Sequence, residues 1–333
     1  MRLGILLFML LPLAVPAQKI QILQTGRMTS LRGLSVVNDR VIWVSGSNGT
    51  VAESVDSGKT WNWIQVKGFE NTDFRDIEAF DDNIAVIMGV GDPAYLLRTI
   101  DGGQNWELVY KNTTPGIFLD AMEFWNDESG IVIGDPIKNR FFIGRTFNGG
   151  NSWQTIPEKN YPIADSGEAC FAASGTNIRK YGMDAACFVT GGLHSRLFLK
   201  NKIIDLPIAQ GNESTGANSI ALKDLKHMVI VGGNYLNPDS VFHNCVLSTD
   251  GGKTWKFPKE GPHGYRSCVD YIHKNEWITC GLNGVDISRD GGLHWEKVSG
   301  KSFNVCLRAK KGRSVFLAGN HGTIARYIDR QTR

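Results

Sequence analysis

The chain has 333 residues, of which 42% are hydrophobic, 21% are charged and 38 are glycine. This composition excludes a disordered chain, which needs low hydrophobicity and high net charge, and the glycine content disfavours a coiled coil. The formal net charge of +3 comes from 36 basic and 33 acidic residues that are mixed along the sequence. Because no dense basic run is present, nucleic acid is not expected as a partner.

Residues 1–17 have the pattern of a secretory signal peptide. A cation, Arg2, precedes an apolar run over residues 3–13, and residues suited to a cleavage site precede Gln18. The apolar run is too short for a membrane anchor, which needs about 20 apolar residues. We therefore expect cleavage at about Ala17/Gln18, no membrane span afterwards, and a secreted or periplasmic location.

Five segments of the chain share the pattern [S/T]-x-[D/N]-x-G-x-x-W. Their third positions are Asp56, Asp101, Asn148, Asp250 and Asp290. The five tryptophans are successively 45, 47, 102 and 40 residues apart. Since the long gap is about twice the others, we expect it to contain one repeat that has lost the motif.

The chemistry of this motif indicates a structural turn. The Asp or Asn side chain can accept hydrogen bonds from the backbone N–H groups that follow it, and the glycine tolerates the positive φ of a tight hairpin. The tryptophan then begins the next strand and buries a large ring. A calcium loop concentrates several oxygen ligands, whereas each motif has one acid, so we expect no metal at these positions.

The segments around each motif predict strands. In the first repeat, apolar runs separated by Gly/Asn turns lie at residues 31–37, 41–45, 51–54 and 62–66. Four strands in one repeat of this length form a blade of a β-propeller. The sequence therefore predicts an all-β fold, a seven-bladed β-propeller over residues 18–333, with the motif-less blade at residues 169–208.

The two chain ends are expected to meet in the last blade. Residues 322–329 align without gaps to residues 49–56 of the first repeat, but the chain stops soon after them. The alternating segment at residues 19–25 can supply the missing fourth strand. Closing the ring in this way would cover a strand edge that otherwise invites aggregation.

The repeats resemble Asp-box, or BNR, propellers, and more closely the bacterial photosystem II stability/assembly factor-like proteins. The stretches that carry this resemblance are Leu31-Arg-Gly-Leu-Ser-Val-Val37, Phe74-Arg-Asp-Ile77, Ala121-Met-Glu-Phe-Trp125, Gly134-Asp-Pro136 and Phe171-Ala-Ala-Ser-Gly175. It covers nearly the whole mature chain, implies the propeller fold, and supplies no catalytic residues. Members are often labelled oxidoreductases or sialidase-like, but no GxGxxG motif supports a dinucleotide site, and no cofactor is expected.

One face of the ring should gather the polar residues of a candidate site, because the start of each innermost strand and the loop between the second and third strands share that face. The ligand-binding candidates at these positions are Arg32, Arg75, Asp76, Asp120, Asp135, Glu168, Tyr235, Tyr265 and Arg266. Three arginines at one repeat position should converge on the axis, where their fixed donors suit a carboxylate or phosphate. The alternative is that Arg–Asp pairs simply tie neighbouring blades together.

Two functional classes fit this arrangement. The first is an exported, non-catalytic binding or assembly factor whose partner is another exported protein. The second is a glycan-active enzyme, a uronate lyase or sialidase-like glycosidase, that holds an acidic glycan in an arginine-rich funnel. Its candidate catalytic residues are Glu168, Asp120, Asp135, Tyr265 and His194, which could move protons. A sialidase fits less well, because the nearest match to its Arg-Ile-Pro segment is Arg32-Gly-Leu34 and sialidases have six blades.

The sequence leaves the disulfide pairing open. An exported chain permits disulfides, yet cysteine is also commonly buried as a plain thiol. The six cysteines are Cys170, Cys187, Cys245, Cys268, Cys280 and Cys306, of which Cys268 and Cys280 should lie on neighbouring strands. The scattered histidines and the lack of CxxC spacing give no reason to expect a metal. We expect a monomer.

Overall fold

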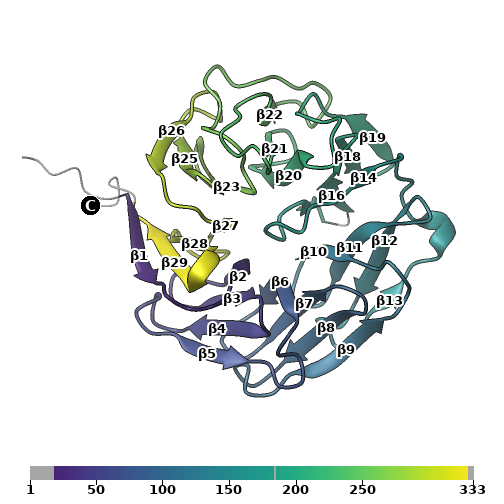
Figure 1. Ribbon diagram of the computed structural model, residues 1–333, viewed down its shortest axis with the longest axis vertical. Coiled ribbons are helices and arrows are strands. Elements are labelled where there is room, and N and C mark those ends of the chain that lie inside the picture. Colours follow the sequence, from purple (N-terminus) through teal and green to yellow (C-terminus); the bar gives the residue numbers. More distant parts are fainter. Residues whose placement is uncertain (1–18, 184, 329–333) are drawn as a thin grey trace, which may run out of the picture.

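Seven antiparallel β-sheets form a ring around a central axis in the computed structural model (Figure 1). The structure describes residues 19–183 and 185–328, so the expected signal peptide, residues 1–17, lies outside the described part. Helical structure in the described part consists of two 3-10 turns, η1 (Glu158–Asn160) and η2 (Asn320–Gly322). None of its helices is long and apolar enough to cross a membrane. The predicted seven-bladed propeller is confirmed.

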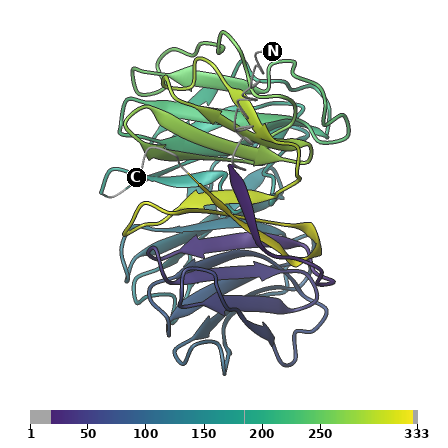
Figure 2. The ribbon, with the colours of Figure 1, turned by 90° about the vertical axis from the view of Figure 1, so that its left-hand side faces the viewer.

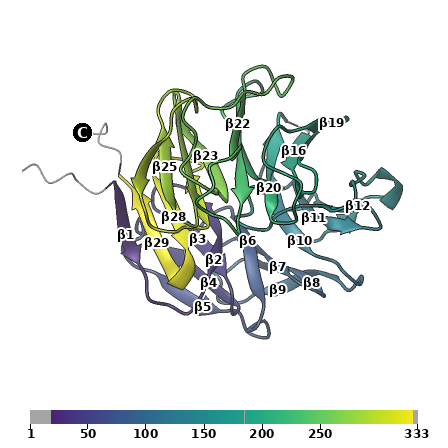
Figure 3. The same ribbon diagram turned by 45° about the horizontal axis from the view of Figure 1, so that its top comes forward.

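Most blades contain four strands that follow one another from the axis outwards. Blade one has β2 (Leu31–Val36), β3 (Ile42–Gly46), β4 (Thr50–Ser54) and β5 (Asn62–Gln65), and blade two has β6 (Asp73–Ala79), β7 (Ala85–Val90), β8 (Ala94–Thr99) and β9 (Glu107–Asn112). Blade three has β10 (Leu119–Phe124), β11 (Gly130–Ile137), β12 (Arg140–Thr146) and β13 (Gln154–Thr155), and blade six has β23 (Cys268–His273), β24 (Glu276–Gly281), β25 (Gly284–Ser288) and β26 (Glu296–Ser299). Figure 3 shows the innermost strands β2, β6, β10, β20 and β23 around the axis.

Blade seven is closed by the N-terminal segment, as the repeat alignment predicted. Its strands are β27 (Val305–Arg308), β28 (Val315–Gly319), β29 (Thr323–Tyr327) and, outermost, β1 (Ile20–Gln24). Ile20 pairs with Tyr327 across the antiparallel β1–β29 ladder and is almost fully buried. Figure 2 shows β1, in purple, beside the yellow C-terminal strands. The first and last strands of the described chain therefore hold the ring shut.

The region without the motif forms blade four, but the first strand of this blade begins later than predicted. Its strands are β15 (Ile178–Tyr181), β16 (Ala185–Val189), β18 (Arg196–Leu199) and β19 (Lys202–Asp205). Blade five has β20 (Thr215–Leu222), β21 (Met228–Asn234) and β22 (Cys245–Ser248), and β14 (Glu168–Ala169) and β17 (Gly191–Gly192) extend its inner edge. Residues 169–177, predicted as the start of blade four, thus precede its first strand. The fourth strand of blade five is reduced to a bridge between Leu247 and Lys256.

The five Asp-box motifs form the hydrogen-bonded turns expected of a structural element. In the first, Ser54 Oγ donates to Asp56 Oδ1 at 2.9 Å, and the N–H of Thr60 donates to the same oxygen at 2.9 Å. Hydrogen bonds from the Thr60 hydroxyl and backbone lower the pKa of Asp56 to about 2. Gly58 has a φ of +81°, and a Cβ there would lie 2.7 Å from a methyl of Leu23. Asp101, Asn148, Asp250 and Asp290 accept the corresponding N–H at 2.9–3.0 Å.

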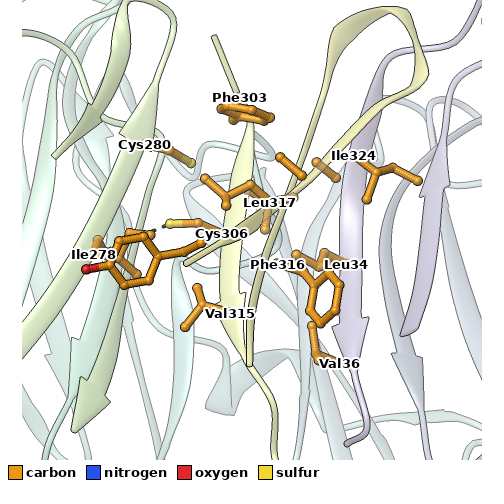
Figure 4. Packing of buried hydrophobic residues seen from close by; sticks show 14 of the residues in the cluster. Leu34, Val36, Ile278, Cys280, Phe303, Cys306, Val315, Phe316, Leu317 and Ile324 are labelled. Atoms are coloured by element: carbon orange, nitrogen blue, oxygen red, sulfur yellow. Dashed lines mark hydrogen bonds between the residues drawn. The ribbon is translucent and has the colours of Figure 1, made fainter. Parts of the chain in front are cut away.

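The largest continuous core lies between blades six, seven and one (Figure 4). Leu34, Ile278 and Phe316 come from these three blades and are almost completely buried. Burying apolar area of this kind is the main favourable contribution to folding, about 25 cal/mol per Å². All six cysteines are buried free thiols, and Cys268 faces Cys280 across the β23–β24 ladder, as expected from the sequence.

Candidate functional site

A pocket of about 320 Å³ opens at the axis on the face where the innermost strands begin, which we call the top face. Residues at or near the starts of six inner strands, β2, β6, β10, β20, β23 and β27, line this axial pocket, together with residues of the connections between strands. Its polar and aromatic lining residues are Arg32, Arg75, Phe118, Phe171, Asn218, Tyr235, Tyr265, Ser267 and Asn304. The repeat therefore brings matching positions of different blades together at the axis.

Residues 170–177, which we call the axial plug, form the floor of this pocket. Ser174 Oγ donates to the carbonyl of Ser267 at 2.8 Å, and the Thr176 hydroxyl lies 2.6 Å from the Ser219 hydroxyl. Gly175 has a φ of +67°, and a Cβ there would lie 2.4 Å from the carboxyl of Asp76. Since Cys170 to Ala173 line the axial pocket and Ser174 to Thr176 line a cavity of about 400 Å³ on the bottom face, the plug separates the two.

Arg32 and Arg75 meet at the rim of the axial pocket. Arg32 Nη1 donates to the carbonyl of Ala173 at 3.3 Å, and Arg75 Nη1 donates to that of Ala172 at 3.5 Å. Arg75 also pairs with Asp73 at 2.8 Å. Burial, followed by the charge of Arg75, lowers the pKa of Arg32. A guanidinium has five donors, so both side chains keep donors for an anion, and an anion between them would offset their mutual repulsion.

An aromatic wall faces these arginines. Tyr235 packs edge-on against Phe171 and Tyr265, with ring centroids 6.1 and 6.3 Å apart. Tyr265 is buried and donates its hydroxyl to Asn218 Oδ1 at 2.8 Å. Burial raises the pKa of Tyr265, so this hydroxyl is placed to hold the pocket wall rather than to exchange protons with solvent.

Arg266 does not join the other two arginines, contrary to the expectation that all three converge. Its side chain is completely buried, and its Nε donates to Asp286 Oδ2 at 2.6 Å. Its Nη1 donates to the carbonyl of Tyr265 and to Asn283 Oδ1 at 2.7 and 2.6 Å. The reason is Asp286 on β25, a buried carboxylate in the same blade that attracts the guanidinium away from the axis. The Arg266–Asp286 pair is therefore structural, but it lies within blade six and does not tie two neighbouring blades together as the alternative supposed.

Two carboxyl groups, Asp120 and Asp135, lie close to Arg75 and Cys170 beneath the rim. Asp120 is fully buried near the backbone N–H of Asp135, but within residues 19–183 and 185–328 neither of its oxygens makes a hydrogen bond of ordinary geometry. Burial and then the charge of Asp135 raise the pKa of Asp120 well above its ordinary value. Burial also raises the pKa of Asp135 to about 6, although its Oδ1 accepts the N–H of Cys170 at 2.9 Å. The two carboxyl groups therefore keep their protons to a higher pH than exposed aspartates do.

The remaining candidates have structural contacts or lie apart. Glu168 is buried against Arg196, whose Nε donates to it at 2.9 Å, and it also accepts the Thr190 hydroxyl. Asp76 accepts the N–H groups of Ile77 and Met122, both at 2.8 Å, which ties blade two to blade three. His194 is exposed on the connection between β17 and β18. These three residues do not line the axial pocket.

Comparisons with known proteins agree with this architecture. Residues 17–117 match the family described as photosynthesis system II assembly factor YCF48, and residues 246–257 match the BNR/Asp-box repeat. The photosystem II stability/assembly factor HCF136 of Arabidopsis thaliana chloroplasts is 30% identical over 117 residues. The chain is thus similar to photosystem II assembly factor-like proteins over its first third and carries the Asp-box repeat of such propellers. The match covers 33% of this propeller and 26% of the length of the Arabidopsis relative.

Solved structures extend the likeness of the fold to nearly the whole propeller. A structure of YCF48 bound to D1 peptide has a TM-score of 0.68 and 17% identity, covering 95% of this chain and 97% of that one. YCF48 from Cyanidioschyzon merolae has a TM-score of 0.65 and 16% identity, covering 93% and 98%. At these identities the likeness shows the fold alone.

Sequence reasoning did not place Phe118, Phe171 or the axial plug in the site of this propeller. Phe171 belongs to a stretch that carried the family resemblance, but the repeat gave it no position because residues 169–177 have no counterpart in the other blades. The feature of the sequence that could have predicted the plug is the long connection before the first strand of the motif-less blade. Because this connection leads into an innermost strand, its extra residues must lie over the axis of the ring or across it.

Proposed function

We propose that this propeller is a non-catalytic factor that binds an extended segment of another protein in the axial pocket. The proposal rests on the position of Arg32 and Arg75, which lie together in the lining of the axial pocket opposite its aromatic wall. A carboxylate of the segment would be held by the guanidinium donors, and a neighbouring side chain would pack against Phe171 and Tyr235.

The comparisons support a protein partner more than a glycan. One solved propeller of similar fold is bound to a peptide, that of D1. The glycan-active alternative receives no support from the related proteins, and it relied on an arginine ring from which Arg266 is absent. Glu168, its first candidate acid, is bound to Arg196. The partner of this chain is therefore proposed to be a protein segment that carries a carboxylate.

We also propose that the protein acts outside the cytoplasm, on the basis of the pattern in residues 1–17. Expression with the native N-terminus, followed by cell fractionation and N-terminal sequencing, tests this proposal. We expect the mature chain to begin at about Gln18 in the exported fraction. A cytoplasmic protein that retains Met1 would contradict it.

Fluorescence anisotropy with labelled acidic and aromatic hexapeptides, each with a free or an amidated C-terminus, tests the binding function. We expect peptides with a carboxylate to bind, and Arg32→Ala or Arg75→Ala to weaken that binding roughly tenfold. Arg40→Ala, which removes an exposed arginine outside the pocket, is the control. Equal binding by all variants would overturn the axial site. Unsaturated, ultraviolet-absorbing products from acidic oligosaccharides would instead favour the lyase.

A further inference from the structure

The outer rim of the bottom face differs at blade four from the blades that carry the motif. In blade one the connection between the third and fourth strands spans residues 55–61 and contains the Asp box, whereas in blade four it is reduced to Lys200 and Asn201. The Asp-box turn of blade five, Asp250 to Lys253, stands next to this short connection. A long turn beside a short one leaves a hollow between them.

This hollow is a cleft of about 840 Å³ between blades four and five, which we call the rim cleft. Its floor is apolar and consists of Tyr181, Leu199, Ile204 and Leu225. The Tyr181 hydroxyl donates to the carbonyl of Leu225 at 3.2 Å, which joins the two blades at the bottom of the cleft. Half of the Leu225 side chain is exposed, so the floor offers apolar surface to a ligand.

Four lysines surround this floor. They are Lys200, Lys202, Lys226 and Lys253, and all four are exposed. Lys200 Nζ lies 5.8 Å from the centre of the Tyr181 ring, which places its charge over the floor. The rim cleft therefore combines positive charge at its edge with apolar surface at its base.

The acidic groups nearby do not neutralise this edge by pairing with its lysine side chains. Asp250 lines the cleft, but its carboxylate accepts the hydroxyl and N–H of Thr254 and the N–H of Lys253. These bonds hold the pKa of Asp250 well below its usual range. Asp224 is bound to His227 at 2.9 Å. Within the described residues, no ion pair of the four lysine side chains is recorded.

The shape of the surroundings favours an extended ligand. β19 is the outermost strand of blade four and has no neighbouring strand on its outer side within the described residues. An extended chain can pair with such an edge through its backbone while its alternate side chains enter adjacent pockets. Ile203 on β19 is half exposed and adds apolar surface along this edge.

We propose that the rim cleft binds an acidic, extended segment of a protein, with its carboxylates on the four lysines and its apolar side chains on the floor. Charge complementarity favours an acidic occupant, and the apolar floor favours a polypeptide over a purely ionic ligand such as a nucleic acid. A hollow with charges at its rim is also unlike the protruding apolar surface that inserts into a lipid bilayer. The cleft lies on the bottom face, so this site is independent of the axial pocket.

The test uses a fluorescein-labelled decapeptide of alternating Glu and Leu, with binding measured by fluorescence anisotropy. Lys200→Gln, Lys226→Gln and Lys253→Gln combined should weaken binding roughly tenfold, because three partly exposed ion pairs are lost. The matched control combines Lys59→Gln, Lys159→Gln and Lys301→Gln. Lys59 holds in the blade-one motif the position of Lys253 in blade five, and all three control lysines are exposed. We expect the control to bind within about twofold of the wild type.

Three outcomes would overturn the proposal. The first is equal binding by the two triple variants, and the second is equal binding of a decapeptide in which Ser replaces Leu, since the floor would then be unused. The third is binding to phosphatidylglycerol vesicles, lost in the Lys200/Lys226/Lys253 variant, without binding of the peptide. Because the axial pocket is also proposed to bind carboxylates, both triple variants are compared in the Arg75→Ala background. The Lys200/Lys226/Lys253 variant should lose binding there too, whereas equal binding of the two triple variants in that background would overturn the rim cleft.

Discussion

Arg75 and Arg266 hold equivalent places in the repeat but lie in opposite environments. Arg75 lies at the rim of the axial pocket, pairs with the partly exposed Asp73 and reaches the carbonyl of Ala172. Arg266 is completely buried, and its guanidinium is bound to the buried Asp286. The difference shows that repeat position fixes where the backbone lies. The nearest buried carboxylate then decides whether the side chain faces the axis.

The first prediction concerns the buried member of this pair. Arg266→Ala should lower the free energy of unfolding by about 3–5 kcal/mol, because it leaves Asp286 buried without its cation. Urea denaturation measures this loss. Arg266→Ala combined with Asp286→Ala should recover a part of it, since the unpaired charge is then also removed. A single-variant loss below about 1 kcal/mol would mean that Arg266 is not a structural cation.

The second prediction tests the floor on which Arg32 and Arg75 rest. Gly175→Ala should lower the free energy of unfolding by about 2–4 kcal/mol, since Ala disfavours positive φ and its Cβ would crowd buried Asp76. Thermal or urea denaturation measures this change. Gly182→Ala is a suitable control, because Gly182 has a similar φ of +74° and, among residues 19–183 and 185–328, nothing lies within 4 Å of an added Cβ. Equal losses in both variants would attribute the effect to backbone strain alone.

Local signals made much of the fold predictable from the sequence. The Asp boxes specify their own hydrogen bonds, as Asp56 and Thr60 show, and the alignment of residues 322–329 to the first repeat located the closing strand β1. The register of the repeat also placed Arg32 and Arg75 at the axis. These features depend on residues that are close in sequence or equivalent in the repeat.

The rest of the site depends on contacts that the repeat does not encode. Asp286 binds the guanidinium of Arg266. The contacts of Arg32 and Arg75 include no carboxylate at the position equivalent to Asp286. The axial plug belongs to one repeat, so comparison with the other repeats could not predict the path of its backbone. Sequence periodicity predicts the scaffold, while the orientation of a charged side chain depends on which single buried partner it meets.

The third prediction uses the acids beneath Arg75. Since folding raises the pKa values of Asp120 and Asp135, their contribution to stability is present below the unfolded value near 4. It is lost as the pH rises through the raised pKa values, of which that of Asp135 is about 6. Asp120→Asn combined with Asp135→Asn should therefore gain about 2–3 kcal/mol over the wild type between pH 4 and pH 8, since each pKa unit corresponds to about 1.4 kcal/mol. Urea denaturation across this range measures it. Burial raises the pKa values of Asp76 and Asp270 as well, so only the difference between the two proteins is informative.

A difference between the two proteins that does not vary with pH would contradict this prediction. The charged groups that face Asp120 are Asp135 and Arg75, and the neighbouring thiol of Cys170 stays protonated because burial raises its pKa. Arg75 acts in the opposite direction to Asp135, since its charge favours the ionised carboxylate.

The smallest expected effect on stability is that of Arg75→Ala at neutral pH. Its ion pair with Asp73 is partly exposed, and such pairs contribute about 0–1 kcal/mol, so the free energy of unfolding should change by no more than this. If the peptide binding proposed for the axial pocket is nevertheless lost, Arg75 acts on the ligand and not on the fold. A loss comparable to that of Arg266→Ala would remove the contrast, because both arginines would then be needed for the stability of the fold.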